Sequence, residues 1–546
     1  MKKRVSAVAL LCAAAMMLSA CGSKPQAPAE TTAAGAAGTE AAGTQTGGES
    51  TPGAADRTGK IVRVAAVDPQ VALDPQQYTY SIVMKITDNI SEALLTTKGD
   101  GSLEPTLLAK MPEISEDQLT YSFELLPDVK FHDGTTLTSA DVKYSYERLV
   151  KLTKMATLLE NVEGYQELAD GTADELSGVV IQDDTHFTIT LTKPYAPFLS
   201  VLSTAYTAIY PHEACEAAGE NWGMTTLYGT GPFKMDSYQT GVGVTLTRFD
   251  DYHGGAVKLD GVDYKFIEDV NTQVLEYQKG NVDYVDVDPS IYPVYSENPE
   301  LKDQMHGFQP TGNYSLGVNV KTYPDAKVRE AIALSIDRKA ICDSILHGTA
   351  TVPTSYIPAG IIGHDETLPE FEYNPERAKQ LLAEAGFPDG IDLRVTVNSK
   401  YQGNVNIATA FQQQAKAAGI NVQVETVDSA AWSDMKKSGG IDCNISNWYV
   451  DYSDPESMLY PMTKTDTNSS FWHNAEFDQL LEDGIATTDS AERQEIYKKA
   501  EHIMTREDWA TTPIYNETKF YLLNPSITGF EIDSTFRMFW KDADIQ

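Results

Sequence analysis

Cysteine is scarce in this sequence, with five residues in 546. Cys12 and Cys21 lie within or at the end of an apolar N-terminal run, so Cys215, Cys342 and Cys443 remain for the rest of the chain. Three thiols cannot all pair, and no CxxC motif or cysteine–histidine cluster is present. Neither disulfides nor a metal therefore organise the fold, and we expect buried free thiols.

Signatures of catalysis are missing as well. The sequence has no GxSxG elbow and no P-loop, and Gly229-Thr230-Gly231 carries Lys234 where a dinucleotide fingerprint needs its third glycine. His212 begins a near match to a zinc-protease helix that lacks the second histidine, and it is interpreted as a surface residue at a helix start. The 78 carboxylates are too many for one acid–base pair to stand out. We expect that the protein is not an enzyme and that it has no catalytic residue, no metal and no cofactor.

Positive charge is also in short supply. The formal net charge is -36, the isoelectric point is about 4.5, and no basic run follows the first few residues. Nucleic acid would be repelled and is excluded as a partner. The preferred interpretation of this acidity is solubility at a cell surface, and the alternative is attraction of a cationic substrate.

The N-terminus combines a basic start with a short apolar stretch. Lys2, Lys3 and Arg4 precede the run from Val5 to Ala20, which ends in Leu18-Ser19-Ala20-Cys21. This pattern resembles a bacterial lipobox, which implies a signal peptide over residues 1–20, cleavage before Cys21 and lipidation of its sulfur. A transmembrane helix is the alternative, but it needs about 20 apolar residues and this run is shorter.

Residues 22–58 contain no Ile, Leu, Val or aromatic residue. Such a segment has nothing to bury and cannot fold alone. A flexible coil of this length spans roughly 30 to 35 Å. Residues 21–58 are therefore expected to be a lipid anchor and flexible tether.

The body of the chain shows both strand and helix patterns. A buried strand is expected over residues 61–67, and alternation of apolar and polar residues predicts strands over 119–125 and 187–191. Thr138 and Asp141 form a capping box that begins a helix. Further on, a stripe of Val328, Ile332 and Ile336 predicts a helix over 325–341.

Two more helices have clear boundaries. Asn374 and Pro375 begin one that Gly386 can end, and a helix over 411–418 stops at Gly419 before an alternating strand over 420–424. Helices joined to strands by short links indicate α/β layering.

Several short motifs occur in a fixed order along the body. Together they resemble those of the family 5 extracellular solute-binding proteins: Leu73-Asp74-Pro75, Val129 to Gly134, Thr138 to Val142, Gly229 to Phe233, Gly280 to Asp283, Val328 to Ala331 with Ile336 to Arg338, and Trp448 to Pro455. Most of them are interpreted as scaffold. Phe131 to Gly134 reads as a tight turn, Gly229 to Phe233 as close backbone packing, and Arg329 as the partner of Asp325 or Asp337.

The resemblance implies an α/β, periplasmic-binding-protein-like two-lobed fold of type II, cluster C-like, with an extra β-rich inserted domain. Lobe I would comprise residues 59–96, 206–310 and 511–546. The inserted domain would span 97–205, and lobe II would span 311–510.

The same resemblance points to a ligand site. An aspartate three residues after the tryptophan pairs with the peptide's α-ammonium in the family's peptide binders, and Asp451 occupies that position. Alternatively, Asp451 caps a local turn. The other implied ligand-binding residues are Asn447, Trp448, Tyr449 and Tyr452 beside it, and Tyr78, Thr79, Tyr80 and Ser81 on the opposite lobe. Some relatives place a carboxylate-binding arginine three residues before the tryptophan, where this chain has Ile445.

The predicted function is the substrate-binding component of an ABC importer. It would be a monomer, lipid-anchored at the extracytoplasmic face, that passes peptides to the permease subunits. An oligosaccharide or nickel-chelate binder of the same fold, a secreted hydrolase and a peptide-sensing receptor are the alternatives.

Overall fold

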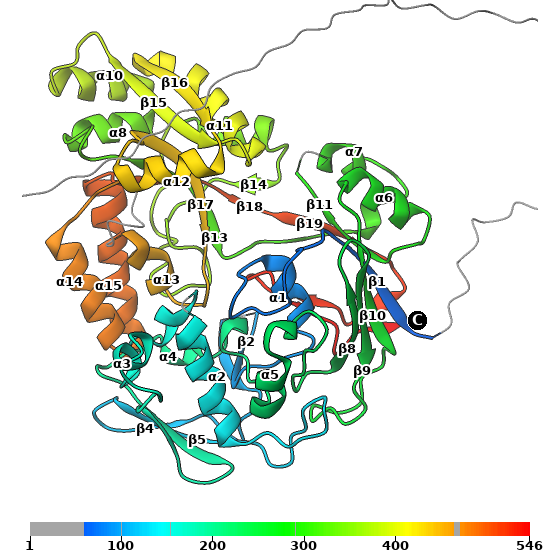
Figure 1. Ribbon diagram of the computed structural model, residues 1–546. Coiled ribbons are helices and arrows are strands. Elements are labelled where there is room, and N and C mark those ends of the chain that lie inside the picture. Colours follow the sequence, from blue (N-terminus) through cyan, green and yellow to red (C-terminus); the bar gives the residue numbers. More distant parts are fainter. Residues whose placement is uncertain (1–58, 100, 153, 290, 463–469) are drawn as a thin grey trace, which may run out of the picture. The chain divides into compact units, whose positions relative to one another are not determined.

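The structure is a computed structural model that describes residues 59–99, 101–152, 154–289, 291–462 and 470–546. The predicted signal peptide, Cys21 and the tether lie outside the described residues. The described residues belong to one compact unit, in which helices and several sheets alternate along the chain (Figure 1).

The first large sheet has seven strands in the order β12, β19, β11, β1, β10, β9, β8. The predicted strand at 61–67 is confirmed as β1, which runs parallel to both β10 and β11. The strands are β1 (Ile61–Ala66), β8 (Phe233–Gln239), β9 (Gly243–Arg248), β10 (Gly261–Phe266), β11 (Tyr284–Val287), β12 (Met305–Phe308) and β19 (Lys519–Leu523).

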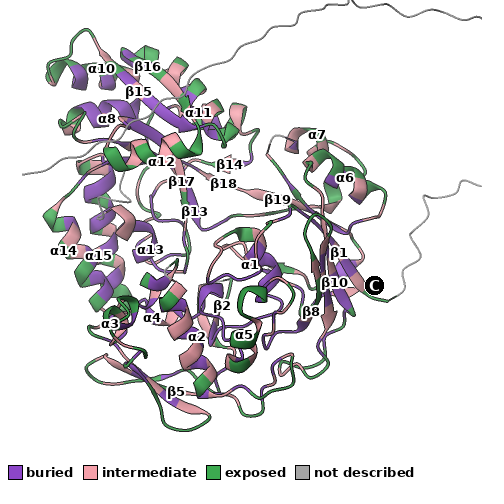
Figure 2. Ribbon diagram, in the orientation of Figure 1, coloured by how far each residue is buried: buried purple, intermediate pink, exposed green. Residues whose placement is uncertain are grey.

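Helix α1 (Ser81–Thr87) lies near this sheet, with α5 (His212–Ala218), α6 (Val270–Gln278) and α7 (Tyr292–Ser296) elsewhere in the same lobe. Val62 and Val64 of β1 pack with Val83 and Ile86 of α1 in one hydrophobic core. Figure 2 shows β1 as largely buried. Alternating and apolar residues thus fix β1 at the centre of the lobe.

The second large sheet has six strands in the order β14, β18, β13, β17, β15, β16. These are β13 (Gly312–Val318), β14 (Ala350–Thr351), β15 (Ile391–Asn398), β16 (Ile420–Val427), β17 (Cys443–Tyr449) and β18 (Thr511–Glu517). Helices α8 (Ala326–Leu334), α10 (Pro375–Glu384) and α11 (Gln402–Gln414) share its core. Helices α12 (Ser429–Ser438), α13 (Glu456–Leu459), α14 (Ala475–Ala486) and α15 (Ser490–His502) complete this lobe.

Helix boundaries in this lobe follow the sequence signals. The Asn374 side chain accepts a hydrogen bond from the backbone N–H of Arg377, which caps α10. Gly419 takes the left-handed conformation at φ 78° between the helical segment and β16. Both boundary predictions are confirmed.

A third group of elements lies within residues 97–205. Its four-stranded sheet runs β4 (Glu113–Ile114), β5 (Thr120–Glu124), β7 (His186–Thr190), β6 (Val179–Ile181), and α2 (Ser139–Leu152) packs in the same core. The two predicted strands pair antiparallel, with Phe123 opposite Phe187. The capping box is confirmed, because the Asp141 carboxylate accepts hydrogen bonds from both the backbone N–H and the hydroxyl of Thr138.

Two scaffold motifs contact each other. The backbone N–H of Gly229 donates to His132 Nδ1, and His132 Nε2 lies 2.9 Å from the carbonyl oxygen of Gly231. A Cβ atom at Gly229 would lie 2.2 Å from the carbonyl oxygen of Ile90, so only glycine fits there. The close backbone packing expected for this motif is confirmed.

Three details differ from the predictions. The helix expected over 325–341 ends at Leu334, because the Ser335 hydroxyl bonds back to the carbonyl of Ile332 and Asp337 caps a new short helix. Arg329 donates to backbone carbonyls rather than to a carboxylate. The third difference is the residue at which the chain returns to the first lobe.

The predicted return to lobe I at residue 511 comes too early. Strand β18 pairs with β13 in the sheet of the second lobe, and only β19 joins the first sheet. The sequence of β18, TTPIYNE, fits a strand of either sheet, so the pattern alone does not choose between them.

The thiol prediction is confirmed for the described residues. Cys215, Cys342 and Cys443 are free and buried. Burial raises the pKa of Cys342 to about 11, so this thiol is neutral at physiological pH.

Candidate binding pocket

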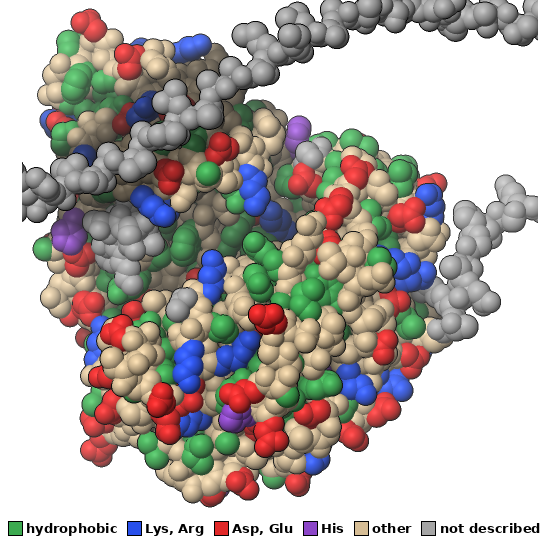
Figure 3. All heavy atoms as spheres, viewed as in Figure 1, with side chains coloured by type: hydrophobic (Ala, Val, Ile, Leu, Met, Phe, Trp, Pro, Cys, Tyr) green, Lys and Arg blue, Asp and Glu red, His purple; other side chains and the backbone are tan. Residues whose placement is uncertain are grey.

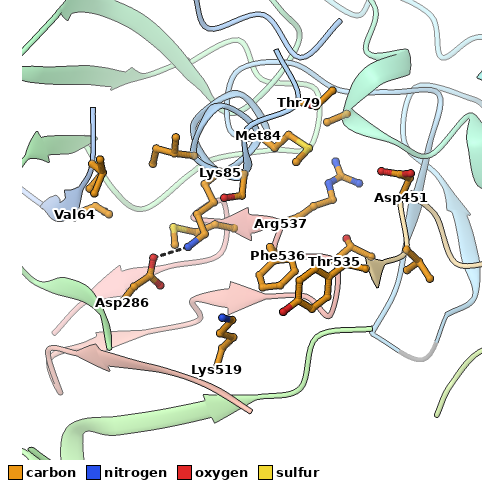
Figure 4. Close-up of a pocket in the computed structure, with 18 of the residues that line it drawn as sticks. Val64, Thr79, Met84, Lys85, Asp286, Asp451, Lys519, Thr535, Phe536 and Arg537 are labelled. Atoms are coloured by element: carbon orange, nitrogen blue, oxygen red, sulfur yellow. Dashed lines mark hydrogen bonds and ion pairs between the residues drawn. The ribbon is translucent and has the colours of Figure 1, made fainter. Parts of the chain in front are cut away.

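A cavity of about 730 Å³ opens where three parts of the chain meet (Figure 4). The first lobe contributes the ends of β1 and β11, helix α1 and residues 535–538. The region within 97–205 contributes Thr97 and residues 203–206, and the second lobe contributes the end of β17 with residues 450–453. This volume is in the range of ligand-binding sites, which is roughly 300 to 1,000 Å³.

Most of the predicted ligand-binding residues lie in this cavity. The structure brings together residues that the sequence separates by more than 350 positions, namely Thr79, Ser81, Asn447, Tyr449, Asp451 and Tyr452.

Trp448 does not line the cavity, although it is the most prominent residue of its motif. Side chains alternate along a strand, so Trp448 faces away from the side that Asn447 and Tyr449 share. Its indole N–H donates to the carbonyl of Ser457 at 2.8 Å. Trp448 therefore holds the loop that follows β17 and is not among the residues that line the cavity.

Tyr78 and Tyr80 also fall outside the lining. Tyr78 packs against the hydrophobic core of the first lobe. Tyr80 precedes α1 and is 54% exposed. Only Thr79 and Ser81 of this segment lie in the wall, because the chain turns into a helix there.

Among the described residues, the end of β17 has one edge with no paired strand. β13 pairs with the whole strand, whereas β15 pairs with it only at Cys443 and Asn444. The Val450 N–H bonds toward the β13 side, at the carbonyl of Thr311. Because backbone groups alternate between the two edges of an antiparallel strand, those of Asn447 and Tyr449 face the edge without a neighbouring strand.

Asp451 lies in the loop directly after this edge. Its backbone N–H donates to the Ser457 hydroxyl at 2.9 Å, which fixes the loop. Its side chain is exposed on the side that faces the open cavity. The cavity walls on the other sides bury it, and this burial raises its pKa to about 6. Within the described residues, its carboxylate has neither an ion pair nor a hydrogen bond.

Aromatic side chains form the wall beside Asp451. Tyr449 stands edge-on to Phe536, with ring centroids 4.9 Å apart, and Tyr314 stacks on Tyr515 at 4.3 Å. The Tyr449 hydroxyl is buried and has no partner among the described residues. Tyr206 completes the wall, and burial together with the charge of Asp451 raises its pKa. The wall offers apolar area to a ligand.

The rest of the cavity holds charges that the sequence prediction missed. Lys85, Asp286, Asp288, Lys519 and Arg537 all line it, and Figure 4 shows the Lys85–Asp286 pair at the end away from Asp451. They come from four segments far apart in the chain, and none lies in a motif that marks a ligand site.

Ile445 stands at the position where some members of the family that the sequence resembles carry an arginine. It is 1% exposed and belongs to the hydrophobic core of the second lobe. It cannot reach a ligand, so any carboxylate of the ligand must be met elsewhere.

Two further features concern only the described ranges. No group of three or more His, Cys, Asp or Glu residues is placed to hold a metal ion there. In the same part of the chain, no helix has the length and apolar character needed to cross a membrane.

Binding of a cationic group at Asp451 should depend on pH. Such a group needs the ionised carboxylate, and burial raises the pKa of Asp451 to about 6. We expect affinity to fall about tenfold between pH 7 and pH 5, as the carboxylate takes up its proton. Calorimetry across this range would measure it. An Asp451→Asn variant should lose this pH dependence, and an unchanged slope would assign the titration to another group.

The chain is similar in sequence to known proteins over most of its length. Residues 102–470 match the family described as bacterial extracellular solute-binding proteins, family 5 Middle. Heme-binding protein A of Haemophilus influenzae is 27% identical over 463 residues, which cover 79% of this chain and 82% of that protein. The glutathione-binding protein GsiB of Escherichia coli K12 is 26% identical over 507 residues, which cover 89% and 95%.

A solved structure shares the fold. The ABC transporter-associated periplasmic binding protein DppA of Helicobacter pylori, in complex with the peptide STSA, superposes with a TM-score of 0.72 at 23% identity. The match covers 89% of this chain and 98% of that chain. These relatives are solute-binding proteins and not enzymes, and their names give them different ligands.

Proposed function

Because the chain belongs to the family 5 bacterial extracellular solute-binding proteins, which work outside the cytoplasm with ABC-type permeases, we propose that its own solute is a peptide. The peptide would bind in the cavity between β17 and α1, and the protein would deliver it to the permease. Asp451 would hold its α-ammonium.

The observation that carries this proposal is the unpaired Asp451 carboxylate at the end of a free strand edge. A carboxylate without a partner in a recessed site binds an ammonium by a charge-assisted hydrogen bond. Its raised pKa also indicates that burial makes this charge costly, and a bound ammonium would reduce that cost.

The free edge of β17 supports the same ligand class. An extended peptide can add to an open strand edge through main-chain hydrogen bonds. The backbone groups of Asn447 and Tyr449 face that edge, immediately before Asp451. A peptide that begins at Asp451 would therefore run alongside β17, with its side chains in the aromatic part of the cavity.

Native mass spectrometry of the purified protein tests the ligand class. We expect a co-purified peptide, released intact by denaturation, because the site holds a ligand and performs no covalent step. A released sugar or metal chelate would refute the peptide assignment. Cleavage of an added peptide would favour the hydrolase alternative instead.

We also propose that the chain is anchored by a lipid on Cys21. The support is the lipobox-like sequence Leu18-Ser19-Ala20-Cys21 and a following segment with no apolar residue to hold a membrane. A Cys21→Ser variant should leave the membrane fraction and appear in the soluble or culture fraction. Fractionation and blotting would measure this, and retention of the variant in membranes would contradict the proposal.

A further inference from the structure

Arg537 reaches the cavity from a tightly held loop, residues 533–537, which joins two short antiparallel strands. The Asp533 carboxylate accepts hydrogen bonds from the backbone N–H groups of Thr535 and Arg537, at 2.8 and 2.9 Å. Phe536 lies between them at φ 67°, in the left-handed region that a side chain of this size rarely adopts. The loop therefore holds Arg537 in place, with backbone strain at the cavity wall.

The protein itself uses three of the five N–H groups that the Arg537 guanidinium carries. Its Nε and Nη2 both lie 3.0 Å from Asp88 Oδ1, and its Nη1 donates to the carbonyl of Ser203 at 2.9 Å. One N–H on each terminal nitrogen is thus left without a partner among the described residues. Because Asp88 takes the side that Nε and Nη2 share, the remaining N–H of Nη2 points toward the side that it shares with Nη1.

The ion pair between Arg537 and Asp88 is incomplete. Both N–H groups go to Oδ1, whereas Asp88 Oδ2 is buried and has no hydrogen-bond partner in the described part of the chain. An arginine and a carboxylate that serve only each other form two parallel N–H···O bonds, one to each oxygen. The orientation of this guanidinium therefore leaves donors for a second anionic group.

Arg537 lies at the same end of the cavity as Asp451. The ring of Phe536, the residue before Arg537, packs edge-on against Tyr449, two residues before Asp451. In Figure 4 the guanidinium of Arg537 extends toward Asp451. A cation from the first lobe and a carboxylate from the second lobe thus flank one aromatic contact.

Lys85 and Lys519 also line the cavity, but they suit a carboxylate less well. Lys85 Nζ lies 2.7 Å from Asp286 Oδ2, and Lys519 Nζ lies 2.9 Å from Glu517 Oε2. Each ammonium is a point charge on a flexible stem, whereas a guanidinium is a planar fork that matches the two oxygens of a carboxylate. Of these cations, Arg537 is therefore the best placed and best shaped to bind one.

The surface as a whole does not attract an anionic group. The formal net charge is -36, and acidic side chains are scattered over the visible face in Figure 3. A carboxylate that enters the cavity also loses water, which is costly unless donors in the cavity replace it. Its binding therefore depends on a specific cation inside the cavity.

We propose that Arg537 binds the C-terminal carboxylate of the peptide through the N–H groups of Nη1 and Nη2 that the protein does not use. This inference rests on the proposed peptide function and deepens it, because it names the carboxylate anchor that Ile445 cannot supply. With the α-ammonium at Asp451, each charged end of the peptide meets an opposite charge, one from each lobe. Peptides with a free C-terminal carboxylate are then the preferred ligands.

Calorimetry on the wild type tests whether the carboxylate is recognised. The probes are peptides of two to five alanines, each as the free acid and as the C-terminal amide. At the length that binds most tightly, we expect the acid to bind about tenfold more tightly than the amide or better, since the amide lacks the charge that pairs with Arg537. Equal affinities, or tighter binding of the amide, would overturn the inference.

A double variant, Arg537→Met with Asp88→Asn, assigns the effect to this cation. It removes both charges of the pair, so that neither remains buried alone. We expect its ratio of acid to amide affinity to fall to about one. The matched control is Lys339→Met with Asp343→Asn, which removes an exposed pair and should keep the wild-type ratio.

Two single variants keep the assignment testable if the double variant does not fold. Arg537→Lys retains a positive charge beside Asp88 but lacks the planar fork, so the ratio of acid to amide affinity should fall. Lys519→Met removes the competing cation. A ratio that is retained in Arg537→Lys and lost in Lys519→Met would overturn the assignment to Arg537.

Failure of the peptide function gives a different result. If no peptide of the panel binds, as acid or as amide, the peptide assignment fails, and the co-purified ligand then decides the role of Arg537. A ligand with an anionic group that binds more weakly to Arg537→Lys supports the anchor. A ligand without an anionic group overturns it.

Discussion

Asp451→Asn should lower the affinity for a free-amino peptide by about 100-fold or more. The ammonium would lose its charged partner in a recessed site, and truncating one member of such a pair costs about 2–5 kcal/mol. Asp451 has no other partner that could compensate, since within the described residues its carboxylate has neither an ion pair nor a hydrogen bond. Isothermal titration calorimetry with the wild type and the variant measures the loss.

The fold should survive this change. The contact that fixes the loop comes from the backbone N–H of Asp451 to Ser457, which the substitution leaves in place. Removing a carboxylate whose pKa is raised to about 6 also removes a charge that burial makes costly. Unfolding of the variant should therefore occur at the same urea concentration as wild type or higher. A variant that is less stable would make its weaker binding uninformative about the ammonium contact.

Asp454→Ala should lower the free energy of unfolding by about 3–5 kcal/mol, because it leaves a buried guanidinium without its counter-charge. Arg493 Nη2 lies 2.8 Å from Asp454 Oδ2, and the two side chains are 6% and 3% exposed. Urea denaturation followed by circular dichroism measures the effect.

Asp343→Ala is the control for this prediction. Asp343 pairs with Lys339 on the surface, where the side chains are 57% and 79% exposed. Exposed pairs contribute about 0–1 kcal/mol. If both variants lost similar stability, burial would not be the reason for the effect at Asp454.

Local structure was predictable where the sequence carries a physical signal. The Thr138–Asp141 capping box, the Asn374 cap and the Gly419 stop all mark boundaries that the structure confirms. Where two signals compete, prediction failed. The stripe through Ile336 favoured a continuous helix, but the Ser335 hydroxyl and the Asp337 cap end one helix and begin another.

Sheet order was beyond the reach of local patterns. β1 was expected as a strand, but its partners β10 and β11 follow about 200 residues later. Strand β18 suits either large sheet by its composition, and the assignment to the first was wrong. Pairing between distant strands depends on tertiary packing that no short window of sequence contains.

The binding site, too, was predictable only in part from the sequence. A resemblance in one motif placed Asn447, Tyr449 and Asp451, which do line the cavity. It also selected Trp448, since a motif does not reveal which face of a strand a side chain takes. Lys519 and Arg537 gave no signal, because they lie in segments that only the fold brings together.

The measurement that tests the central claim most directly is calorimetry on a two-by-two set. It combines wild type and Asp451→Asn with a free-amino peptide and its N-acetylated form. If Asp451 holds the α-ammonium, acetylation should weaken binding to wild type by about 100-fold and binding to the variant by far less. Equal losses from acetylation in both proteins would show that Asp451 does not contact the amino terminus, and would contradict the account.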